Sequence, residues 1–152
     1  LAQSVMNSIL TLTAIAVKDY EVTRLLLAHN FLEEQAQFCL HFLRPEEEDR
    51  IALELAKHSP PAMIVLLVAS IKVLSCAAPI LSNETYGPKI MKAMRRALSY
   101  LPTEYQESIV RLCSTSFSGF DADTFLNINR TAPKIGEEIM IPVLSKCVKK
   151  HD

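Results

Sequence analysis

The most evident candidate binding feature of the sequence is a group of basic side chains at helical spacing. They lie within the segment KIMKAMRRALSYL, residues 89–101, as Lys89, Lys92, Arg95 and Arg96. Residues three, four or seven positions apart share a face of an α-helix, which leaves the apolar residues between them for the opposite face. The pattern predicts a basic strip that binds an acidic or phosphorylated segment of a protein partner. A solvated helix face with no binding role is the alternative.

The cysteines and histidines lack the spacing of a metal site. Zinc sites need ligands that converge on one ion, and neither C-x-x-C nor H-E-x-x-H occurs in the chain. Cys39 and His41 are two residues apart in helical sequence, so their side chains would point about 200° apart. We therefore expect no bound metal and no cofactor.

Signatures of catalysis are equally scarce. The acidic clusters at residues 33–34, 46–49 and 137–138 stand at expected helix starts, where the helix dipole favours carboxylates. The chain has only three glycines and contains neither a Gly-rich phosphate loop nor a Gly-x-Ser-x-Gly motif. We therefore expect a protein that catalyses nothing.

Apolar residues recur at helical spacing along nearly the whole chain, and Pro, Gly and Asn interrupt the pattern. Asp19 and Asp121 are expected N-caps, and Pro142 is expected to kink or interrupt the last helix. The pattern predicts helices at residues 5–16, 19–30, 31–43, 45–58, 62–78, 89–101, 102–115, 121–127 and 133–150.

The helix expected at residues 62–78 is apolar on nearly every face, which is typical of a helix surrounded by its neighbours. Its length is marginal for a bilayer, and Lys72 lies well inside it, where a charge opposes membrane insertion. We therefore expect this helix at the centre of the core and no association with a membrane.

The four cysteines follow a regular spacing. Intervals of 37, 37 and 34 residues separate Cys39, Cys76, Cys113 and Cys147, in the contexts QAQFC, IKVLSC, SIVRLC and VLSKC. This period resembles that of the armadillo and HEAT class of α-solenoids, whose units contain stacked helices. The resemblance implies an all-α fold, a right-handed α-solenoid of stacked antiparallel helix pairs. An irregular helical bundle is the alternative.

The composition is that of a globular protein with no strong charge bias. The chain has 152 residues, 49% of them hydrophobic, and a net charge of −1 at pH 7, so bulk charge does not direct it to nucleic acid. We expect a single helical domain, residues 1–152, that is a fragment of a larger protein. Its cysteines lie in apolar sequence, where we expect buried, reduced thiols of the kind found in the cytoplasm or nucleus.

Together these patterns predict an intracellular protein–protein interaction scaffold or adaptor domain that binds a peptide or a partner subunit through a helical surface. A nucleic-acid-associated regulatory domain that uses the basic strip is one alternative. A homo-oligomerisation module that pairs through the uncharged first helix is another.

Overall fold

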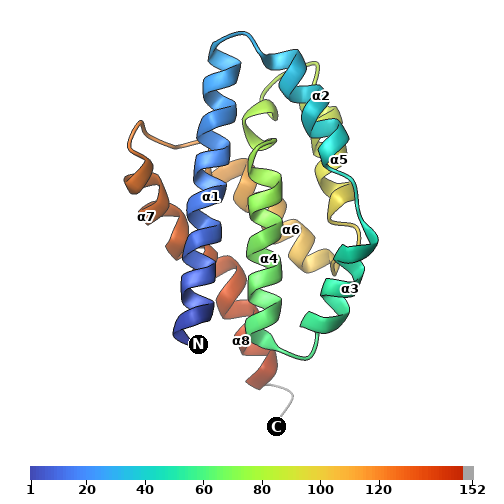
Figure 1. Ribbon diagram of the computed structural model, residues 1–152, viewed down its shortest axis with the longest axis vertical. Coiled ribbons are helices and arrows are strands. Elements are labelled where there is room, and N and C mark those ends of the chain that lie inside the picture. The colour runs from blue at the N-terminus through green and yellow to red at the C-terminus, as the bar shows by residue number, and fades with distance from the viewer. Residues whose placement is uncertain (149–152) are drawn as a thin grey trace.

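A computed structural model describes the backbone of residues 1–148 and the side chains of residues 1–146 (Figure 1). This part of the chain consists of helices and turns and contains no strand, which confirms the all-α prediction. The α-helices are α1 (Gln3–Ala28), α2 (Leu32–Phe42), α3 (Glu47–Ala56), α4 (Pro60–Ser75), α5 (Gly87–Ala97), α6 (Thr103–Arg111), α7 (Thr124–Ile135) and α8 (Ile141–Val148). A 3-10 turn spans Ala78–Ile80, and π-helical turns span Leu112–Ser116 and Gly136–Met140.

Helix α4 lies at the centre of the described fold, as predicted for the apolar segment at residues 62–78. It contacts α1 along its length and also contacts α3, α6 and α8 (Figure 1). Ile64, Leu67 and Val68 have no exposed surface, because neighbouring helices cover α4 on several sides. No helix within residues 1–148 is both long enough and apolar enough to cross a membrane.

Helix α1 corrects the prediction of separate helices at residues 5–16 and 19–30. It runs without a break through Asp19, which therefore caps no helix. Ala16, Val17 and Tyr20 are all buried, so the apolar face that packs against the core continues past Asp19. This packing outweighs the local preference of an aspartate for a cap. The predicted stop at Asn30 is confirmed by its left-handed φ of 69°.

The C-terminal helices also begin at residues other than those predicted. Asp123, and not Asp121, caps α7, because its carboxylate accepts hydrogen bonds from the backbone N–H groups of Phe125 and Leu126 at 2.9 and 3.1 Å. Helix α7 then continues through Pro133, where a new helix was predicted to begin. The interruption predicted near Pro142 takes the form of the π-helical turn that directly precedes α8.

The cysteines that suggested a repeat lie in different local settings. Cys39 is within α2, Cys76 follows α4, and Cys113 lies in the π-helical turn after α6. Helix α1 contacts α7 as well as α4, and several helices share α4 as their neighbour. A solenoid of stacked helix pairs is therefore not confirmed, since in a solenoid each unit contacts mainly the next one. Cys147 belongs to α8, but its side chain lies outside the described residues.

Candidate functional site

The helix that carries the predicted basic residues is held in place by a tight turn before it. The side-chain oxygen of Asn83 accepts hydrogen bonds from the backbone N–H groups of Thr85 and Tyr86 at 3.0 and 2.9 Å. Gly87 follows, and a Cβ atom at this position would lie 2.3 Å from the carbonyl oxygen of Leu81. Only glycine allows the backbone this close approach. Pro88 in the first turn then starts α5 in a fixed direction.

The inner face of α5 is the apolar face that the sequence predicted. Ile90, Met94 and Leu98 are buried, as are Ala97 and, after the helix, Leu101. Met91, which was also predicted to point inward, is half-buried. These apolar residues pack α5 against the core and leave its basic side chains on the other face.

Three of the four predicted binding residues line one shallow groove. Lys89, Lys92 and Arg96 surround about 280 Å³ of space, whose remaining wall is formed by Leu40 of α2 and Ala93 of α5. Arg95 is exposed on the same helix but does not line this space. We call the lining residues, Leu40, Lys89, Lys92, Ala93 and Arg96, the basic groove. It lies between α2 and α5, which run side by side in Figure 1.

The cations of the basic groove have few partners within the described part of the chain. The Arg96 guanidinium donates a long hydrogen bond of 3.4 Å to the carbonyl oxygen of Leu43, and the Lys89 ammonium lies 5.6 Å from the centre of the Tyr86 ring. Within residues 1–146, no carboxylate lies within ion-pair distance of Lys89, Lys92, Arg95 or Arg96. Their charges are therefore available to an external anion.

The chemistry of the basic groove suits an anion that has an apolar neighbour. Two ammonium groups and one guanidinium can surround a phosphate or carboxylate, and the guanidinium can donate two parallel hydrogen bonds. Leu40 and Ala93 provide an apolar wall beside these donors. Sequence analysis did not identify Leu40, because it belongs to a different helix and only the fold brings it next to the basic residues.

Comparisons of the chain with protein-family models, with curated proteins and with solved structures found no match.

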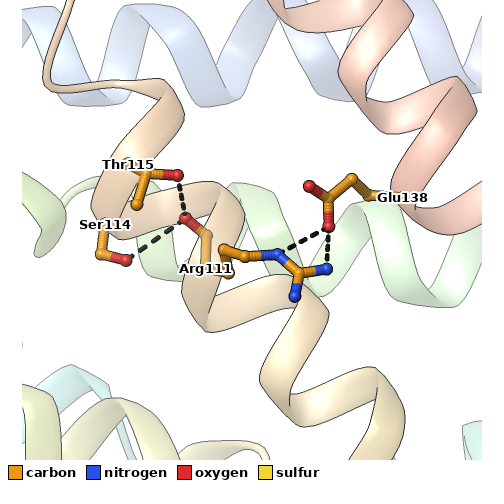
Figure 2. A network of polar contacts seen from close by, with 4 residues as sticks. All are labelled: Arg111, Ser114, Thr115 and Glu138. Carbon is orange, nitrogen blue, oxygen red and sulfur yellow. Dashed lines mark hydrogen bonds and ion pairs between the residues drawn. The ribbon is translucent and has the colours of Figure 1, made fainter.

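The acidic residues that were interpreted as helix-start residues include one with a different role. Glu138 lies in the π-helical turn before α8 and forms an ion pair with Arg111 at the end of α6 (Figure 2). Ser114 and Thr115 donate hydrogen bonds of 3.2 and 2.8 Å to the Arg111 carbonyl oxygen, which lies where the α-helix changes to a π-helical turn. The hydrogen bond with Glu138 raises the pKa of Arg111. This network connects two turns and therefore has a structural role.

The described cysteines are free thiols with different exposure. Cys39 and Cys113 are buried, as predicted, whereas Cys76 is half-buried. Burial raises the pKa of Cys113 and keeps it a neutral thiol. Among the described residues, no group of three or more His, Cys, Asp and Glu side chains is placed to hold a metal ion.

A second groove lies between α1, α2 and the end of α4, and it is mainly apolar. Its volume is about 330 Å³, and its lining includes Val22, Leu26, Phe38, Phe42, Lys72 and Cys76. The rings of Phe38 and Phe42 stack with their centres 5.4 Å apart and are about half exposed. We call this space the apolar groove. The sequence predicted a helix at residues 31–43 but did not show that Phe38 and Phe42 would face a groove.

Proposed function

We propose that this chain is a non-catalytic protein-interaction domain that binds an acidic or phosphorylated segment of a partner protein in the basic groove. The observation that supports the proposal most strongly is the meeting of Lys89, Lys92 and Arg96 around one space, with no carboxylate of residues 1–146 within ion-pair distance. Basic residues that only keep a protein soluble do not need to cluster next to apolar residues. A scaffold or adaptor role follows from this mode of binding.

The proposal includes an intracellular location and an armadillo-like or HEAT-like organisation. Free thiols at Cys39, Cys76 and Cys113 support a reducing compartment such as the cytoplasm or nucleus. The regular cysteine spacing supports a repeat origin for the helices. An irregular helical bundle is the alternative organisation, and the packing of several helices around α4 supports it.

Binding of a phosphopeptide library by fluorescence anisotropy tests the proposal. The library varies the residues around a central phosphoserine, and each peptide is compared with its unphosphorylated form. Because charge-assisted hydrogen bonds contribute about 1.5–3 kcal/mol each, the best phosphopeptide should bind at least about tenfold more tightly than its unphosphorylated form. A leucine near the phosphoserine should strengthen binding by contacting Leu40. Equal affinity for both forms across the library would contradict the proposal.

Oligonucleotide binding and light scattering distinguish the two other candidate functions. A nucleic-acid-binding domain would bind a single-stranded oligonucleotide more tightly than any phosphopeptide, with an affinity that falls steeply as salt increases. Homo-oligomerisation through α1 is favoured by the exposure of Leu10 and Ile15, at 47% and 37%. Light scattering would then report a mass that rises with concentration.

A further inference from the structure

Two cysteines from distant parts of the sequence meet at the junction of α2 and α4. Cys39 of α2 has no exposed surface, and its Sγ atom lies 3.7 Å from the carbonyl oxygen of Cys76, which is 37 residues away in sequence. The Sγ atom of Cys76 lies 3.5 Å from the carbonyl oxygen of Val73. Residues far apart in sequence are therefore neighbours in the fold.

The proximity of the two thiols makes them chemically different. Their interaction raises the pKa of Cys39 and lowers the pKa of Cys76. The nearby charges act in opposite directions on Cys76, because Lys72 of α4 favours a thiolate and Asp19 of α1 opposes it. The first proton to leave the pair therefore comes from Cys76.

The two cysteines also differ in their access from solvent, and this difference again favours reaction at Cys76. Cys76 is half-buried and lines the apolar groove of about 330 Å³, whereas Cys39 does not line it. A small oxidant that enters the apolar groove therefore meets Cys76 first. Cys39 lies behind it, in a position to react with an oxidised Cys76.

We propose that Cys39 and Cys76 form a peroxide-sensitive thiol pair that closes to an intramolecular disulfide. In the first step the Cys76 thiolate attacks hydrogen peroxide, the O–O bond breaks, and Cys76 sulfenic acid and hydroxide form. In the second step the Cys39 sulfur attacks the Cys76 sulfur, and the hydroxyl group leaves as water with the Cys39 proton. Peroxide is reduced and the two thiols are oxidised by two electrons. This inference is independent of the basic groove.

The disulfide would attach α2 covalently to the end of α4. A cross-link across 37 residues restricts the unfolded chain, so oxidation should raise the melting temperature by roughly 5–15 °C. Reduction with dithiothreitol should reverse the change. An oxidised protein that melted at or below the temperature of the reduced protein would show that the bond does not fit the native geometry.

Peptide mapping of the wild-type protein is the primary test. The reduced protein is treated with a small excess of hydrogen peroxide, its remaining thiols are blocked, and it is digested with trypsin without reduction. Cleavage after Arg50 and after Lys72 places Cys39 and Cys76 in separate peptides. Mass spectrometry should find these peptides joined, with the Cys113 peptide still carrying the blocking group after denaturation. Joined peptides that contain Cys113 or Cys147 instead would overturn the proposal.

Single variants test the order of the steps. Cys39→Ser should let Cys76 reach sulfenic acid, which dimedone traps, whereas Cys76→Ser should leave the buried Cys39 unoxidised under the same conditions. Cys113→Ser is the matched control and should leave the cross-link unchanged. Oxidation of Cys39 in the Cys76→Ser variant at the rate of Cys76 in the Cys39→Ser variant would refute the assigned roles.

Discussion

At the scale of single residues, Gly87 decides how the basic groove is positioned. The Leu81 carbonyl oxygen approaches so closely that any side chain at Gly87 must displace the turn before α5. Asn83 holds the same turn through its two hydrogen bonds to backbone N–H groups. The sequence contained a signal for this break, because Asn83 and Gly87-Pro88 marked the end of one helix and the start of the next. It contained no signal for the contact with Leu81, which depends on the path of the backbone.

We expect Gly87→Ala to lower the free energy of unfolding by about 2 kcal/mol, because its Cβ overlaps the Leu81 carbonyl and the backbone must shift. Urea denaturation followed by circular dichroism measures the change. Gly136→Ala is the matched control, since nothing lies within 4 Å of the added Cβ and its backbone is helical. It should leave stability unchanged or raise it by up to about 1 kcal/mol. Equal losses in both variants would contradict a specific steric role for Gly87.

At the scale of elements, local sequence signals predicted several helix ends at proline or asparagine, although α7 continues through Pro133. Asn30 and Pro60 mark helix ends much as expected. The errors arose where tertiary contacts override a local preference. Aspartate is favoured at N-caps, but Asp19 lies within a helix whose buried face continues past it. Asp121 is the same residue type, yet Asp123 makes the capping hydrogen bonds.

The contact between α7 and α1 is one that sequence could not predict, because it joins residues about a hundred positions apart. The buried Asn127 side chain donates to Glu21 of α1 at 2.7 Å and to the carbonyl oxygen of Asp121 at 2.9 Å. Thr124 also donates to Glu21, at 2.7 Å. Each of these residues looks ordinary in the sequence, and only the fold brings them together.

Replacing Asn127 with alanine should therefore destabilise the attachment of α7. The Glu21 carboxylate loses a donor and the Asp121 N–H loses its acceptor, so we expect a loss of about 2 kcal/mol in the free energy of unfolding. Hydrogen exchange should become faster in α7 before it does so in α4. The exposed Asn129 on the same helix provides the control, and Asn129→Ala should change stability by less than about 0.5 kcal/mol. Similar losses in both variants would count against the Asn127 network.

At the scale of the whole molecule, composition and periodicity were sufficient for the all-α class and for the central position of α4. They were insufficient for the arrangement of the helices around it. The cysteine spacing suggested repeat units, but it did not show that Cys39 would contact Cys76. Likewise, the basic strip was visible from spacing alone, but the wall that Leu40 adds and the separation of Arg95 from the groove depend on how α2 packs against α5.

The proposed function requires that the basic groove, and not positive charge in general, binds the partner. Calorimetric titration of the tightest phosphopeptide at physiological salt, into Lys92→Glu and Arg95→Glu in parallel, tests it most directly. The two variants change net charge equally on one exposed helix face, but only Lys92 lines the groove. Lys92→Glu should weaken binding about 10-fold to 100-fold, and Arg95→Glu less than about threefold. Equal losses in the two variants, or unchanged affinity in Lys92→Glu, would contradict the claim.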